Sequence, residues 1–225
     1  MMSDSPRPDY LKFTAVEGKA ISVKLSTMGK INNASIEISV NGAKFVSYEL
    51  GSDINLNQGE CVEFRRTPGS VATVLSESTS SYCFFRTTGV IQCSGNVMSL
   101  LDASCESVSV GNYGFVNLFI DNTSLISAPY VGAKIFGTEA MQSMFSGCSN
   151  IVSHRFASIN ASSSLFGRNN RCASFTCEEE TPQGLQESTL SGLPPDCIIY
   201  VPAASVDSYK SANRWSDRAD YIEGF

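Results

Sequence analysis

The chain contains one histidine, His154, so any mechanism that pairs a serine or cysteine nucleophile with a histidine base must use it. The motifs that accompany such chemistry are missing: there is no G-x-S-x-G, phosphate-binding glycine loop, H-E-x-x-H or calcium-binding loop. His154 follows an expected strand at 150–153, and we expect a structural or surface role for it. Scattered carboxylates leave a hydrolase as an alternative, but no pair stands out. We therefore predict a non-enzymatic protein without a cofactor.

Cysteines and clustered acidic residues are the candidate metal ligands. The cysteines include no C-x-x-C pair and match neither a zinc ribbon nor a redox motif. Most lie beside aromatic or aliphatic residues, so we expect them to be reduced and buried, with one or two disulfides or a metal site as alternatives. Glu178–Glu180 precede Thr181-Pro182 and predict a solvated turn, with a cation site as the alternative. We predict no metal site. The eight cysteines are Cys61, Cys83, Cys93, Cys105, Cys148, Cys172, Cys177 and Cys197.

The charge balance and hydropathy of the chain exclude several partners. The net charge is −6, the pI is about 4.8, and no cluster of lysines and arginines occurs. Neutralising nucleic-acid phosphates requires a basic face, so we expect no nucleic-acid binding. The first ten residues lack the features of a secretory signal, and no apolar stretch reaches the about 18 residues that a membrane span needs. We therefore expect no membrane span and no export by the standard route.

Residues 10–96 show the period-two alternation of strands with one buried and one solvated face. In Leu11–Ala15, for example, apolar residues occupy every second position. Asn41-Gly42 supplies the two positive-φ residues of a type I′ turn and predicts a hairpin. Further short apolar runs, among them Val71–Leu75, complete the expected strands. We predict an antiparallel β-sandwich over 10–96, preceded by an extended arm over 1–9.

Two segments in the second half of the chain, Phe115–Tyr130 and Met141–Phe156, repeat one another at an offset of 26 residues. At this offset Phe119 falls on Phe145, and the other positions expected to be buried also agree in character. A degenerate third copy follows around Leu165-Phe166. Such a period is typical of a solenoid, whose units bury their apolar sides against their neighbours. We predict a short solenoid within 97–225.

The last residues, about 198–225, form a distinct unit. A strand at Cys197–Val201 precedes a helix that begins at Val206, with Ser205 expected to cap it and Asp207 near its positive end. Trp215, the only tryptophan, is expected to fold over the open end of the solenoid. The last repeat would otherwise expose apolar surface, so we predict a C-terminal cap.

Ile198–Phe225, with IIYVP, VDSYK and a following tryptophan, resembles the closing segment of BspA-like leucine-rich-repeat proteins of Bacteroides-type gut bacteria. Ser143–Ser153, SMFSGCSNIVS, is similar to the repeat core of that family, and Ala173–Pro182 resembles its last repeat. YLKFTAVEG and VIQCSGNVMSLL resemble a β-rich domain that precedes such repeats in Bacteroides surface proteins and in virion proteins of their phages. The resemblance implies a mainly β chain with two domains, at 10–96 and 97–225.

Together with the missing leader, the resemblance implies a phage virion structural protein: a head fibre, a capsid decoration protein or a tail-associated fibre, assembled in the host cytoplasm. A bacterial cell-surface adhesin is the alternative. The N-terminal arm and sandwich would contact other virion proteins, and the repeats would contact a host-surface protein or glycan. Fibres of this kind are commonly homotrimers, so we expect a homo-oligomer, with a trimer favoured.

Polar residues of the repeats form a possible partner-binding face. A rigid repeat surface that bears polar side chains suits the recognition of a protein or a glycan. The alternative is that these side chains only keep the surface soluble. The residues of this predicted face are Asn122, Ser124, Ser149, His154 and Arg155.

Overall fold

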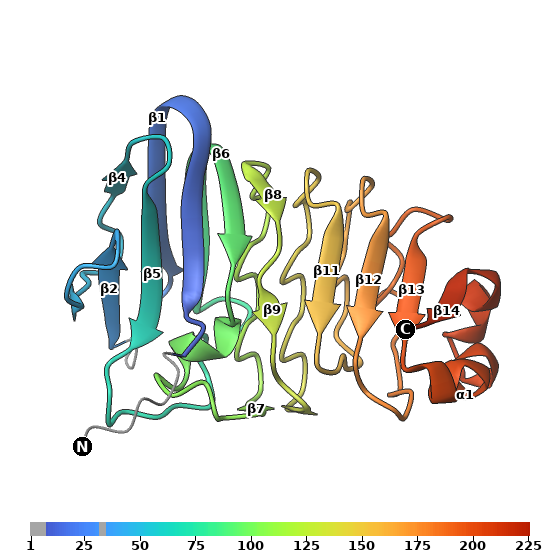
Figure 1. Cartoon of the computed structure of the whole chain (residues 1–225). Coiled ribbons are helices and arrows are strands. Elements are labelled where there is room, and N and C mark those ends of the chain that lie inside the picture. Colours follow the sequence, from blue (N-terminus) through green and yellow to red (C-terminus); the bar gives the residue numbers. More distant parts are fainter. Residues whose placement is uncertain (1–7, 32–34) are drawn as a thin grey trace, which may run out of the picture.

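The computed structural model of the chain, shown in Figure 1, describes residues 8–31 and 35–225. Within these residues the protein is mainly β-structure with one short α-helix near the C-terminus, as the sequence predicts. The predicted arm at 1–9 lies outside the described residues except for Pro8 and Asp9. The strands are β1 (Leu11–Met28), β2 (Ile36–Val40), β3 (Val46–Ser47), β4 (Ile54–Leu56), β5 (Cys61–Arg66), β6 (Tyr82–Ser94), β7 (Ser109–Val110), β8 (Leu125–Ser127), β9 (Tyr130–Val131), β10 (Ile135–Phe136), β11 (Ser153–Phe156), β12 (Ser174–Cys177), β13 (Ile198–Val201) and β14 (Ile222–Gly224). The helical segments are η1 (Val97–Leu100), η2 (Ala203–Ser205), α1 (Val206–Ser211) and η3 (Ser216–Tyr221).

The two long strands, β1 and β6, pair antiparallel along almost their whole length. Their register shifts between Ala15 and Ser22, and there β1 bends over the top edge of the molecule (Figure 1). Gly18 and Gly89 lie at this bend with φ of 144° and 77°. A Cβ on Gly89 would lie only 2.9 Å from the carbonyl oxygen of Glu17, so the close approach of the strands requires glycine there. Because of the bend, one half of β1 pairs with β5 and the other half with β4.

Aromatic side chains fill the space between the two halves of this bent pair of strands. The ring centroids of Phe13 on β1 and Phe85 on β6 are 4.7 Å apart. Phe64 on β5 packs edge-on against both rings, at 5.6 and 5.1 Å. Tyr48 contacts Phe64 at 5.6 Å, and its hydroxyl donates to the carbonyl of Ser52 at 2.6 Å. The strand order is β3-β2-β5-β1-β6-β8, with β4 paired to β1.

The local predictions for this half have different outcomes. Asn41 and Gly42 have φ of 52° and 75°, which confirms the predicted turn after β2. The strand predicted at Val71–Leu75 is wrong, because this segment forms no part of the sheet. The Thr73 carbonyl accepts a hydrogen bond from the N–H of Gly111 at 2.7 Å, so the segment pairs its backbone with a later part of the chain.

Strands β9, β11, β12, β13 and β14 form a parallel sheet in that order. Before β8, and again between β9 and β11 and between β11 and β12, the chain passes through a run of turns, and these return segments are hydrogen-bonded to each other as well. Phe119 N–H donates to the Met144 carbonyl at 2.9 Å, and Phe145 N–H donates to the Leu165 carbonyl at 3.1 Å. The rings of Phe119 and Phe145 stack at 5.3 Å. Each turn of chain is therefore tied to the next on two sides, with apolar side chains between. The return segments lie at 115–120, 141–147 and 163–168.

The two predicted domains, 10–96 and 97–225, share one framework. β6 pairs antiparallel with β1 and parallel with β8. On the opposite side, Phe85 N–H donates to the Leu118 carbonyl at 2.8 Å, and the Phe85 ring stacks on Phe119 at 5.5 Å. The predicted boundary therefore falls inside a continuous hydrogen-bonded structure, and buried apolar residues from both sides belong to one core cluster.

The segments α1, η3 and β14 close the C-terminal end of the parallel sheet (Figure 1). Trp215 is buried, its Nε1–H donates to the Gln183 carbonyl at 2.8 Å, and its ring packs against Tyr209 and Phe175 at 4.7 and 6.3 Å. This confirms the predicted position of the tryptophan over the last turn. Ser205 precedes α1 as predicted, but its side chain makes no capping hydrogen bond. The turn η2 leads directly into α1, so Ser205 has helical rather than extended dihedral angles and cannot cap.

Replacing Phe119 with alanine should destabilise the whole chain, because its ring lies between Phe85 and Phe145. We expect a loss of about 3–5 kcal/mol in the free energy of unfolding, measured by urea denaturation. Phe225→Ala is the control, because this ring is 61% exposed and its removal should change stability little. Amide-exchange protection in the Phe119→Ala protein should fall in β1 and β6 as well as in the parallel sheet. A loss confined to 97–225 would contradict a shared core.

Candidate functional site

The structure does not bring the five predicted face residues together on one surface. Asn122 and His154 are each only 3% exposed, so neither can contact a partner. Ser124 and Ser149 are partly exposed, and Arg155 is exposed. The prediction is therefore wrong for Asn122 and His154. For His154 the error is one of phase: the strand was expected at 150–153, but β11 runs from 153 to 156, so alternation turns residue 154 inward.

The side chain of Asn122 is hydrogen-bonded to residues of the neighbouring strand β6. Its amide donates to the Phe85 carbonyl at 3.3 Å, and its side-chain oxygen accepts from the Thr87 hydroxyl at 2.7 Å. The repeat offset places Asn122 on Cys148, whose thiol donates to the Phe119 carbonyl at 2.9 Å. Both side chains bond to the preceding turn of the chain. The same alignment that revealed the repeat could have identified Asn122 as an internal position.

His154 lies among aromatic rings in the core. Its ring centroid is 4.6 Å from that of Phe145 and 5.1 Å from that of Phe166. Neither of its nitrogens makes a hydrogen bond of ordinary geometry, and neither does the buried side-chain oxygen of Asn169. The Asn169 side chain interacts with the imidazole and partly opposes the fall in its pKa. Burial lowers the pKa of His154 to about 3, so the imidazole is neutral at physiological pH. This histidine is sealed from solvent and has no access to a substrate.

One row of side chains that point away from the core crosses the parallel sheet from β9 to β14. The strand register places Tyr130, Arg155, Thr176, Tyr200 and Glu223 opposite one another on neighbouring strands. All five are at least partly exposed. Neighbouring strands are about 4.8 Å apart, so this outer row crosses the sheet at right angles to the strands.

The first part of the outer row is held in place by Glu178. Arg155 contacts the Oε1 atom of Glu178 through Nε and Nη2, both at 2.6 Å, and the Tyr130 hydroxyl donates to Oε2 at 2.8 Å. The guanidinium lies 5.2 Å from the centroid of the Tyr130 ring. Burial and the bond to Glu178 raise the pKa of Tyr130 to about 12, so its hydroxyl remains protonated and donating at physiological pH. The three side chains therefore form a fixed polar and aromatic platform.

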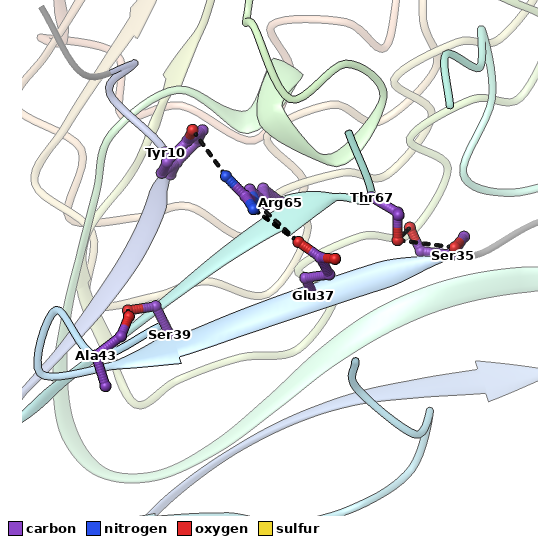
Figure 2. A network of polar contacts seen from close by, with 7 residues as sticks. All are labelled: Tyr10, Ser35, Glu37, Ser39, Ala43, Arg65 and Thr67. Carbon is purple, nitrogen blue, oxygen red and sulfur yellow. Dashed lines mark hydrogen bonds and ion pairs between the residues drawn. The ribbon is translucent and has the colours of Figure 1, made fainter. Parts of the chain in front are cut away.

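A second network of the same composition lies near the N-terminal end of the molecule. Figure 2 shows Arg65 between Tyr10 and Glu37. Arg65 donates from Nε and Nη2 to Glu37 Oε2 at 3.0 and 2.8 Å, and from Nη1 to the Tyr10 hydroxyl at 3.2 Å. Its guanidinium is also 3.8 Å from the Phe45 ring centroid. Tyr10 is only 7% exposed, so this network is more enclosed than the one around Arg155.

Backbone pairing connects these two networks. Tyr10 forms a single parallel β-bridge with Asn96, and Asn96 forms another with Tyr130. Arg65 is opposite Glu37 on the neighbouring strand. The outer row therefore continues across the junction, and its solvent-accessible part is the one that includes Arg155.

The outer row offers phenol, guanidinium, carboxylate and hydroxyl groups, with Ser153 and Ser174 opposite one another on adjacent strands. Such groups recognise a polar ligand by hydrogen bonding and ring stacking. The eight cysteines are free thiols, and six of them are buried. Over residues 8–31 and 35–225, no three His, Cys, Asp or Glu side chains are grouped to hold a metal ion. Those same residues include no helix long and apolar enough to span a membrane.

Comparison with known proteins found no relative. No protein-family model matches the chain, and neither a curated protein nor a solved structure is significantly similar to it. The resemblance of residues 198–225 to BspA-like proteins therefore stays a prediction.

Acid should weaken the fold through His154. As the pH falls, the unfolded chain takes up the proton near pH 6.5, whereas the folded chain does so only near pH 3. The stability from the neutral imidazole is complete above pH 6.5 and is lost as the pH falls through this window. At pH 5 the loss should be about 2 kcal/mol.

The measurement is the free energy of unfolding of the wild-type and His154→Leu proteins, by urea denaturation at pH 7 and pH 5. Carboxylates with lowered pKa, such as Glu139 and Asp102, are common to both proteins and cancel in the difference. The wild-type protein should lose about 2 kcal/mol more than the variant. Equal losses in the two proteins would contradict a buried neutral histidine.

Proposed function

We propose that this protein is a non-enzymatic structural component of a phage virion: a head fibre, a capsid decoration protein or a tail-associated fibre. In this proposal residues 10–96 are a β-sandwich that attaches the chain to the particle. Residues 97–225 are a short, capped, leucine-rich-repeat-like solenoid that faces outward and contacts a host-surface protein or glycan. The chain acts as a homo-oligomer, with a trimer favoured, and is assembled in the host cytoplasm.

The outer row is the observation that carries the recognition part of this proposal. Tyr130, Arg155 and Thr176 lie side by side on a sheet whose turns are hydrogen-bonded on two sides. Arg155 and Tyr130 are already ordered by Glu178 before any ligand binds. A ligand therefore has little side-chain entropy to remove, and preorganised surfaces of this kind bind with a smaller entropic cost.

The burial of reactive side chains supports a role without catalysis. The single histidine is enclosed by phenylalanine rings and stays neutral. Burial raises the pKa of the Cys83 and Cys148 thiols to about 12, which removes the reactive thiolate at neutral pH. His154, Cys83 and Cys148 are thus buried in the core, where they stabilise the fold.

The placement in a virion rests on the resemblance of residues 198–225 to BspA-like proteins. A bacterial cell-surface adhesin would use the same outer row, so location separates the two possibilities. Antibodies against the chain should label purified phage particles in immunoelectron microscopy. Label on uninfected bacteria, with none on particles, would favour the adhesin and contradict the virion.

Replacing Arg155 with alanine should weaken ligand binding at least about tenfold, because it removes the guanidinium and releases Tyr130 and Glu178. The measurement is binding of the whole chain to host polysaccharides on a glycan array and to host cells. Arg168→Ala is the matched control: Arg168 is 72% exposed against 68% for Arg155, and it also pairs with a single carboxylate, that of Asp121. It lies on a return segment and should leave binding unchanged. Equal losses in both variants, or wild-type binding by Arg155→Ala, would contradict the assigned surface.

The predicted arm, 1–9, is the proposed particle anchor and is tested by deletion. A phage that carries the shortened protein should form particles without it, measured by quantitative mass spectrometry of purified virions. Thermal melting of the isolated shortened protein is the folding control, and it should show a small loss of stability, because the deletion removes the Asp9 carbonyl that accepts from Asn96 N–H at 2.8 Å. Normal occupancy in the particles would assign attachment to another part of the chain.

A further inference from the structure

The sulfur atoms of Cys172 and Cys197 lie 3.7 Å apart in the core. Cys172 lies two residues before β12 and Cys197 lies directly before β13, on neighbouring turns of the chain. The register is fixed by the backbone, since Ile198 N–H donates to the Ala173 carbonyl at 2.9 Å. Both cysteines are free thiols and are 0% and 1% exposed.

The side-chain geometry brings the two sulfurs into van der Waals contact. At 3.7 Å they need to approach by only about 1.7 Å to reach the disulfide bond length of about 2.05 Å. Other buried cysteines are engaged elsewhere: the thiol of Cys148 donates to the Phe119 carbonyl at 2.9 Å, and Cys177 is 3.5 Å from the Tyr209 hydroxyl.

We propose that Cys172 and Cys197 form a reversible disulfide site that crosslinks the last turns of the parallel sheet. A small-molecule disulfide, such as glutathione disulfide, is the oxidant. The Cys197 sulfur attacks one glutathione sulfur, which breaks the glutathione S–S bond and forms a mixed disulfide; the first glutathione leaves and takes up the Cys197 proton. The Cys172 sulfur then attacks the Cys197 sulfur and displaces the second glutathione, which takes up the Cys172 proton. Two protein thiols are oxidised, and one glutathione disulfide is reduced to two thiols.

The electrostatic surroundings assign the order of these steps. The contact with Cys172 and the nearby charge of Arg218 lower the pKa of Cys197, against the effect of burial. The contact with Cys197 and burial raise the pKa of Cys172. Cys197 is therefore the better first nucleophile, because the thiolate is the reactive form.

Access to the sulfurs comes from the segment between the two cysteines. Residues 178–197 contain no helix or strand, and such segments open at lower free-energy cost than a sheet does. Arg218 donates to the carbonyls of Leu190 and Leu193 from this segment at 3.4 and 3.1 Å, and so ties it to the cap. A disulfide between 172 and 197 would close the segment into a loop and restrict it in the unfolded chain.

The test incubates the whole folded chain in glutathione buffers of graded redox potential, and a parallel sample is refolded in the most oxidising buffer. Free thiols are then blocked under denaturing acid conditions. Trypsin leaves Cys172, Cys177 and Cys197 in one peptide, since no lysine or arginine lies between Arg171 and Lys210. Cleavage after glutamate separates Cys197 from the other two, and mass spectrometry then identifies which cysteines are joined. We expect a Cys172–Cys197 crosslink and a rise in melting temperature of about 5–10 °C on oxidation.

The controls are Cys172→Ser, which removes one partner, and Cys148→Ser, which removes a buried thiol of an earlier turn that is hydrogen-bonded to the Phe119 carbonyl. Cys172→Ser should lose both the crosslink and the oxidation-dependent rise in melting temperature, whereas Cys148→Ser should keep both. Complete alkylation of Cys172 and Cys197 in the most oxidising buffer, folded and refolded, would overturn the proposal. A predominant crosslink to Cys177 would also overturn it.

Discussion

Two ladders of backbone hydrogen bonds hold each turn of this chain against the next, one between parallel strands and one between return segments. The aromatic rings between the ladders set their separation: Phe85 on β6 stacks on Phe119, and Phe119 stacks on Phe145, with the last two rings on consecutive return segments. An aromatic ring buries a large apolar area, and its shape leaves few ways to pack. The rest of the molecule depends on this column of rings, because both ladders begin at the bent strand pair of β1 and β6.

This constraint divides the residues of each turn into two groups. Inward positions are committed to packing or to satisfying the backbone of the neighbouring turn, as Asn122 and Cys148 do. Outward positions on the strands are not needed for packing or for satisfying the backbone of the neighbouring turn. Arg155 and Thr176 belong to this second group, and their neighbours on adjacent strands extend it into a row. The accessible side chains of the parallel sheet are therefore alternate residues of short strands.

Features that depend on residues close together in the chain could be predicted from the sequence. Predictions were wrong where the phase of a strand, or pairing between distant segments, decides the position of a residue. The Asn41-Gly42 turn and the burial of Trp215 could be predicted, because positive φ angles and a lone large ring leave few alternatives. The inward position of His154 could not be, since a strand displaced along the chain exchanges its two faces. Val71–Leu75 has the apolar pattern of a strand, yet it bonds to a later turn rather than to the sheet.

Sequence alone determined that the chain is mainly β, that its second half repeats, and that a short helix with Trp215 ends it. These properties follow from the spacing of apolar side chains, from turn-forming residues and from the repeat itself, all of which can be observed along the chain. Tertiary structure alone decided that the two halves share a core and that Tyr130, Arg155 and Thr176 stand in one row. It also brought the sulfurs of Cys172 and Cys197 together. The physical reason is that register between strands far apart in the chain is set by packing of the whole core, which no local pattern encodes.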